Sequence, residues 1–147
     1  MIGSCKCKNL IIDWKIRDLS LIPRACQCDY CRESKIQWVS KSGSNFSLTV
    51  RYSNKYQVDK NGTSLASFHK CLNCQEVVAI SSTINNKNYG AINVQCLSQS
   101  NRFPCAKKVT PEKNLTGKSR QNMWQQNWCY PVEIITTNRP PKLFVVK

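Results

Sequence analysis

Cysteine spacing is the feature that most constrains this chain. Seven of its ten cysteines fall into short-spaced groups, which are Cys5-x-Cys7, Cys26-x-Cys28-x-x-Cys31 and Cys71-x-x-Cys74. Two cysteines one or two residues apart on a tight turn place both sulfurs about 2.3 Å from one zinc ion, and a second pair completes a tetrahedron. The spacing therefore predicts metal ligands rather than a disulfide framework.

The first and last pairs together predict a structural zinc site. Cys5 and Cys7 lie far along the chain from Cys71 and Cys74, so one ion bound by all four would tie two distant segments together. A shell of four thiolates leaves no open coordination position, and its binding free energy becomes folding free energy. We expect this site to stabilise the fold and to take no part in chemistry.

The middle group offers only three thiolates, those of Cys26, Cys28 and Cys31. Three protein ligands leave a fourth position for water, substrate or another side chain, as in catalytic zinc sites. An open zinc lowers the pKa of an incoming thiol or polarises a carbonyl oxygen. The group therefore favours a catalytic zinc. Two alternatives remain open: His69 closes the site as a fourth ligand, or the three cysteines bind no metal.

Chain length and net charge limit the classes of function that this chain can have. The 147 residues suit one domain, and a net charge of +14 favours anionic partners. The basic residues are dispersed, which argues against a nucleic-acid-binding tail. One zinc with four thiolates has a net charge near −2, so some of the basic residues offset the charge of this site. No apolar run reaches the roughly 18 residues of a membrane span. The first residues show no signal-peptide pattern, so we expect a reducing, cytoplasmic location.

Short runs rich in β-branched and aromatic residues predict a mainly β fold with little helix. The expected strands are residues 10–16, 36–39, 46–52, 77–80, 91–97 and 132–135, with one or two final strands between 132 and 146. A helix of a turn or two follows Asp29. Residues 98–122 are polar, contain Pro104, Pro111 and Gly117, and predict a long loop. We therefore expect residues 1–97 to form a zinc-binding core, and residues 98–147 to add a polar basic loop and C-terminal strands that pack on the same domain.

Five motifs occur in a recognisable order. They are Gly3-Ser4-Cys5-Lys6-Cys7, Cys26-Gln27-Cys28-Asp29-Tyr30-Cys31-Arg32, the stretch from Trp38-Val39 to Phe46, Cys71-Leu72-Asn73-Cys74, and Asn93-Val94-Gln95-Cys96-Leu97. Together they resemble the glutathione-dependent formaldehyde-activating enzyme family, which includes the centromere protein V type domains. The resemblance runs from about residue 3 to residue 97. It implies an Mss4-like fold of antiparallel sheets around a structural zinc, with a second zinc in a cleft.

The resemblance also implies roles for individual residues. It assigns Cys5, Cys7, Cys71 and Cys74 to the structural zinc, and Cys26, Cys28 and Cys31 to the catalytic zinc. The namesake reaction joins glutathione to formaldehyde, a carbon-sulfur lyase type of chemistry run in the direction of addition. A thiolate near zinc would add to the aldehyde carbon, and the metal or Arg32 would stabilise the developing alkoxide. The implied partner is a small-molecule thiol such as glutathione.

Two other readings compete with this enzyme. One is a zinc-stabilised binding module for an anionic ligand or a nucleic acid, without catalysis. The other is a chain in which only the structural zinc is bound and the cleft is inactive.

Two positions depart from the family's pattern. Lys8 and Gln75 stand where the family usually has Gly, one after each pair of the structural site. Gly eases positive φ at such turn positions, so we expect the turns here to differ. The metal ligands themselves are intact.

Overall fold

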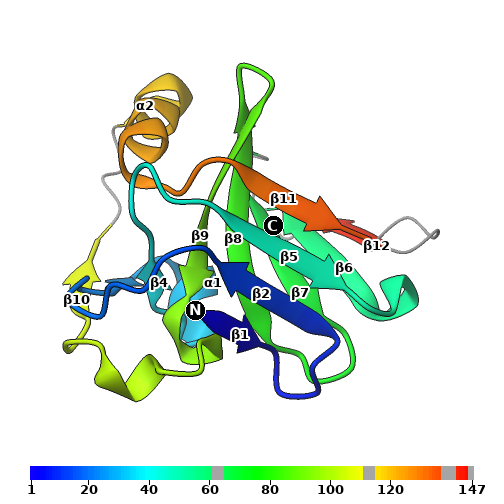
Figure 1. Ribbon diagram of the computed structural model, residues 1–147. Coiled ribbons are helices and arrows are strands. Elements are labelled where there is room, and N and C mark those ends of the chain that lie inside the picture. The colour runs from blue at the N-terminus through cyan, green and yellow to red at the C-terminus, as the bar shows by residue number, and fades with distance from the viewer. Residues whose placement is uncertain (61–64, 111–114, 137–141, 146–147) are drawn as a thin grey trace.

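The computed structural model describes residues 1–60, 65–110, 115–136 and 142–145, and within them the chain forms two β-sheets (Figure 1). The smaller sheet has the order β1-β2-β5-β11, and the larger has the order β10-β3-β4-β9-β8-β7-β6-β12. The described helices are few and short. The prediction of a mainly β fold with little helix is confirmed.

A strand occurs in each expected region, but five further strands, at residues 2–4, 24–26, 56–60, 67–71 and 107–109, were not expected, and the strand expected at 91–97 ends at residue 93. The smaller sheet contains β1 (Ile2–Ser4), β2 (Leu10–Trp14), β5 (Phe46–Val50) and β11 (Val132–Ile135). The larger contains β3 (Arg24–Cys26), β4 (Trp38–Val39), β6 (Tyr56–Lys60), β7 (Ser67–Cys71), β8 (Val77–Ile84), β9 (Lys87–Asn93), β10 (Lys107–Val109) and β12 (Lys142–Val145). The α-helices are α1 (Asp29–Glu33) and α2 (Gly117–Asn127), and 3-10 turns span Ser53–Lys55, Val94–Cys96 and Ser100–Arg102. The short helix expected after Asp29 is α1.

The sheets are mixed rather than purely antiparallel, which corrects the expectation. Consecutive strands such as β8 and β9 pair antiparallel, but β10 pairs parallel with β3, β11 with β5, and β12 with β6. All three parallel strands come from beyond residue 106, and each lies at the edge of its sheet. The C-terminal part of the chain therefore extends both sheets instead of forming a unit of its own.

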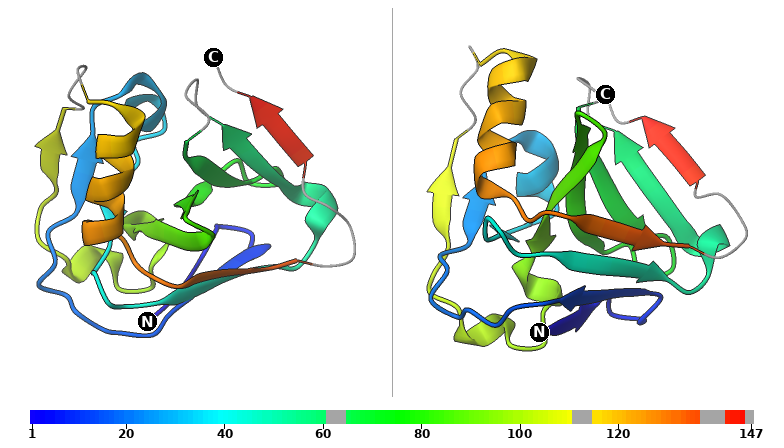
Figure 2. Two further views of the ribbon diagram at one scale, coloured as in Figure 1. Left: turned by 90° about the horizontal axis from the view of Figure 1, so that it is seen from above. Right: turned by 45° about the horizontal axis from the view of Figure 1, so that its top comes forward.

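One hydrophobic core lies between the two sheets, where the smaller sheet covers one face of the larger (Figure 2). Alternate residues of β2 and β5 are fully or almost fully buried, as the period of a half-buried strand requires. They pack with Val78, Ala79 and Ile92 of the larger sheet. Cys96 is also buried in this core.

A second cluster covers the opposite face of the larger sheet. It contains Trp38 of β4, Phe68 of β7 and Ile80 of β8. Val39 and Ala79, which follow Trp38 and precede Ile80 in sequence, belong to the first core. Cys31 of α1 and Trp128, just after α2, pack against the same face. The larger sheet is therefore buried on both sides, and its second face carries the three-cysteine group.

The segment predicted as a long loop contains regular structure, so that prediction is wrong. Within residues 98–122 the described part includes a 3-10 turn, β10 and the start of α2, while residues 111–114 lie outside the described residues. Thr116 caps α2, its hydroxyl oxygen accepting a hydrogen bond from the Ser119 amide at 3.1 Å. The helix has no apolar periodicity, which explains why the sequence did not predict it. No described helix is long and apolar enough to cross a membrane.

Candidate metal centres and the cavity beside them

The four-cysteine group forms where two turns meet. Cys5 and Cys7 follow β1, Cys71 ends β7, and Cys74 lies in the next turn. The four Sγ atoms all lie within 4.8 Å of one another, with Cys7 Sγ 3.6 Å from Cys5 Sγ and 3.5 Å from Cys71 Sγ. Four sulfurs bound tetrahedrally at about 2.3 Å lie about 3.8 Å apart. The donor set and its spacing therefore fit a zinc ion.

Both turns of this group keep a positive φ without glycine. Lys8 has φ 64° and Gln75 has φ 65°. The Lys8 amide donates to the Cys5 carbonyl at 3.0 Å, and the Leu10 amide donates to Cys5 Sγ at 3.3 Å. Both residues thus adopt the left-handed conformation that glycine favours. The left-handed conformation is retained at an intrinsic cost of about 1–2 kcal/mol for each residue with a side chain.

The three-cysteine group is formed by β3 and α1. Cys26 ends β3, Cys28 is the N-cap of α1, and Cys31 lies one helical turn later, so the chain reversal turns all three thiols to one side. Their Sγ atoms lie within 4.8 Å of one another. Cys28 Sγ accepts from the Cys31 amide at 3.5 Å, and the indole of Trp38 donates to Cys31 Sγ at 3.4 Å. The sequence grouping of the seven cysteines is thus reproduced in space.

Contacts among the thiols favour one thiolate in each group. Hydrogen bonds from Cys26 and then Cys31 lower the pKa of Cys28 strongly, while the hydrogen bond to Cys26 raises that of Cys31. In the other group, a hydrogen bond from Asn73 is the main cause that lowers the pKa of Cys7 to about 6. A bound cation would favour the thiolate form of all seven thiols.

His69 belongs to neither group. It lies on β7, buried, with Nδ1 2.6 Å from the Tyr56 hydroxyl and Nε2 2.7 Å from the Ser81 hydroxyl. Burial lowers its pKa to about 3, so the ring is neutral. Both ring nitrogens are occupied by these hydroxyls, and the alternative in which His69 closes the three-cysteine site is wrong.

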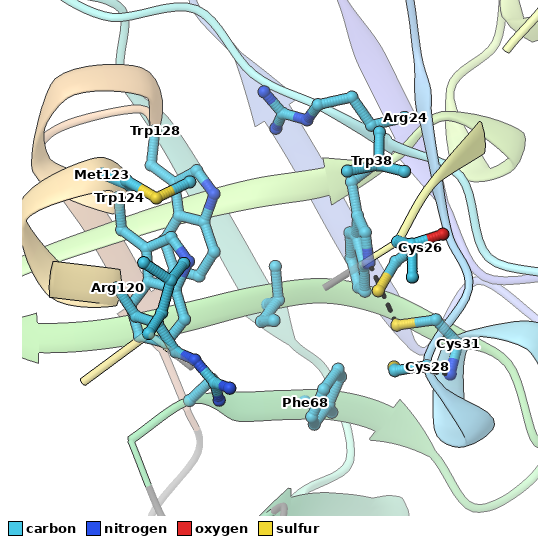
Figure 3. Close-up of a pocket in the computed structure, with 15 residues that line it drawn as sticks. Arg24, Cys26, Cys28, Cys31, Trp38, Phe68, Arg120, Met123, Trp124 and Trp128 are labelled. Atoms are coloured by element: carbon cyan, nitrogen blue, oxygen red, sulfur yellow. Dashed lines mark hydrogen bonds between the residues drawn. The ribbon is translucent and has the colours of Figure 1, made fainter. Parts of the chain in front are cut away.

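The three-cysteine group opens into a cavity of about 520 Å³ (Figure 3). The cysteines form one wall with Trp38 and Phe68, and residues of α2 form the facing wall. The remaining lining residues are Arg24, Ala66, Ile80, Val109, Thr110, Leu115, Arg120, Met123, Trp124 and Trp128. The walls are thus mainly apolar and aromatic, and the three thiols face this cavity.

The arginines of this cavity are not the one that the sequence indicated. The Arg32 side chain is 63% exposed, pairs with Asp29 at 3.2 Å, and does not line the cavity. Arg24 and Arg120 line it instead; Arg24 donates to the Ser40 hydroxyl at 2.8 Å, and Arg120 extends from α2 (Figure 3). No local pattern marks these two arginines among the chain's many basic residues, and Arg120 lies in the segment predicted as a loop.

A crystal structure of a Rhodobacter sphaeroides protein has a similar fold. The match has a TM-score of 0.56 at 20% sequence identity, and it covers 67% of this chain and 89% of that protein. No protein-family model matches the chain, and a search of curated proteins finds no match. The similarity establishes a shared fold.

Proposed function

We propose that this protein is a zinc-dependent enzyme of the carbon-sulfur lyase type that acts on a thiol adduct of a small aldehyde. The observation that carries the proposal is the position of Cys26, Cys28 and Cys31 in the wall of the large cavity. The four-cysteine group, in contrast, already supplies four ligands. The two sites suit different tasks, one structural and one chemical.

The donor set of the cavity site fits a zinc ion with one position left for a small molecule. When bound, zinc supplies Lewis acidity and stabilises a thiolate at neutral pH. Trp38 holds Cys31 by its indole hydrogen bond, and the aromatic walls surround the reacting groups with apolar surface. The chain's own residues therefore position the ligands and lower the local dielectric.

The reaction balances without a redox partner. In the direction of addition, the thiol sulfur forms a bond to the aldehyde carbon, the carbonyl π electrons move to oxygen, and the thiol proton reaches that oxygen. The described lining residues include no carboxylate and no imidazole, so water in the cavity carries the proton. Arg32, to which the sequence assigned an alkoxide-stabilising role, lies outside the cavity and does not take that role.

The small-molecule partner follows from this chemistry. Glutathione or a similar thiol bears carboxylates, which the cavity arginines and the net charge of +14 favour. A reducing compartment such as the cytoplasm suits the proposal, because the seven grouped cysteines bind a metal only as thiols.

Turnover together with zinc content tests the proposal. The zinc-loaded protein is assayed with glutathione and a series of aldehydes beginning with formaldehyde. Cys28→Ser is expected to reduce zinc from two ions to one per chain and to lower turnover at least 100-fold, with the circular dichroism spectrum retained. Cys105→Ser, an exposed thiol outside both groups, is the matched control and leaves both values unchanged. Two bound zinc ions without turnover of any thiol and aldehyde pair would contradict the proposal.

The alternative is a zinc-stabilised module that binds an anionic ligand or a nucleic acid without catalysis. The net charge of +14 favours it. It predicts that affinity for single-stranded or duplex nucleic acid falls steeply as salt rises. Absence of such binding even at low salt would eliminate the nucleic-acid form of this alternative.

A further inference from the structure

The cavity is poorly matched to a small polar compound. Two of its walls are formed by aromatic pairs: Trp124 and Trp128 are stacked with ring centroids 4.6 Å apart, and Trp38 and Phe68 lie 6.2 Å apart (Figure 3). Ile80 and Met123 add further apolar surface. A one-carbon aldehyde group would leave most of this surface against water, whereas a flat apolar body would cover it.

Two arginines line the cavity, and one of them has no described side-chain partner. Arg120 is half-buried, and no described side chain accepts a hydrogen bond or an ion pair from its guanidinium. Arg24 donates to the neutral Ser40 hydroxyl, and the described lining contains no carboxylate. A guanidinium in an apolar setting favours an anionic partner because a charge-assisted, bidentate hydrogen bond replaces the lost hydration.

From these two observations we infer that the compound bound in this cavity is an amphipathic anion, an aromatic carboxylate whose ring lies between the tryptophan pair and Phe68 and whose carboxylate binds Arg120. The inference rests on the proposed function and refines it, because it replaces the small aldehyde half of the adduct by an aromatic one. Arg120 and Trp124 then become the residues that determine specificity, and both come from α2.

Binding of simple probes tests this without requiring turnover. Isothermal titration calorimetry on the zinc-loaded protein compares 2-naphthoate, its neutral isostere 2-naphthamide, and acetate. We expect 2-naphthoate to bind at least tenfold more tightly than either of the others, since a hydrogen bond to a charged group is worth about tenfold to a hundredfold. Equal affinity for 2-naphthoate and 2-naphthamide, or no binding of either, would overturn the inference.

Variants on one helix locate the interaction. Arg120→Gln should reduce 2-naphthoate affinity to the level of 2-naphthamide and leave 2-naphthamide binding unchanged. Lys118→Gln removes the same charge from an exposed position of α2 and should change neither. Trp124→Ala should weaken both aromatic probes. If Arg120→Gln does not change 2-naphthoate affinity, the carboxylate binds the metal instead. If Lys118→Gln lowers that affinity as much as Arg120→Gln does, only the net charge matters. Either result refutes the assignment of the carboxylate to Arg120.

The two proposals fail in different ways. Selective binding of 2-naphthoate through Arg120 without any turnover leaves this inference intact and removes the lyase. Turnover of small polar adducts with no preference for the aromatic probes does the reverse. Circular dichroism and zinc content confirm that each variant is folded.

Discussion

The indole nitrogen of Trp38 donates a hydrogen bond to the sulfur of Cys31 across 3.4 Å, from β4 to α1. Both residues are buried, and the sulfur is one of three candidate ligands on the cavity wall. A donor of this kind orients the ligand and stabilises its charge, as outer-shell partners of metal ligands do.

Replacing that donor should weaken zinc binding at one site alone. Trp38→Phe keeps the ring and removes the N–H, so we expect zinc affinity at the three-cysteine site to fall about tenfold. Competition with a chromophoric chelator measures it. Trp14→Phe is the control, since the Trp14 indole donates to the Ser44 hydroxyl and not to a sulfur of either group, and its loss should reduce stability without affecting zinc. Equal loss of zinc affinity in both variants would contradict the role given to Trp38.

The two metal groups should differ in their importance for stability. Cys71→Ser removes a ligand that joins β7 to the turn after β1, and we expect the chain to lose cooperative unfolding or to melt at a much lower temperature. Cys31 belongs to the three-cysteine group, so Cys31→Ser should lower the melting temperature far less. Thermal melts of both variants, with and without chelator, compare them. The reverse order would mean that the assigned roles are exchanged.

Replacing Lys8 by glycine should stabilise the protein, because φ at this position is 64°. Lys8→Gly relieves the left-handed strain while increasing the entropy of the unfolded chain, and we expect a net gain of about 0.5–1 kcal/mol in the free energy of unfolding. Lys6→Gly in the same turn is the matched control, because Lys6 is not among the described residues with positive φ, and it should destabilise. Urea unfolding of the zinc-loaded proteins gives both values; stabilisation by neither change would show that the turn is unstrained.

A side chain at Gly3 should destabilise the entry to the four-cysteine site. A Cβ there would lie 2.6 Å from the backbone carbonyl oxygen of Cys96, closer than the backbone allows without a shift. We expect Gly3→Ala to cost about 1–3 kcal/mol, as overpacking does. Ser4→Ala, at the next position of β1, is the comparison and should be nearly neutral in the same denaturation assay. A neutral Gly3→Ala would show that β1 moves freely.

Sequence spacing was enough to group the seven cysteines, because ligand pairs on tight turns are local in sequence. It was also enough for β2 and β5, whose alternating apolar residues bury one face. The sequence did not predict helix α2, because none of its residues is buried. Its Arg120 and Trp124 line the cavity instead. Parallel pairing of β11 with β5 depends on contacts across most of the chain, which no local pattern encodes.

The four-cysteine site has a consequence for how the protein is made. Cys7 and Cys71, whose sulfurs lie 3.5 Å apart, are separated by 64 positions in sequence. At a synthesis rate of about 5–20 residues per second, the first half-site waits roughly 3–13 seconds before its partner exists. During that interval its two thiols are open to oxidants and to the wrong metal ions. A metal ion could therefore be bound by all four cysteines only after about half of the 147 residues have been synthesised, and the yield of correct binding would depend on the zinc and thiol balance of the cell.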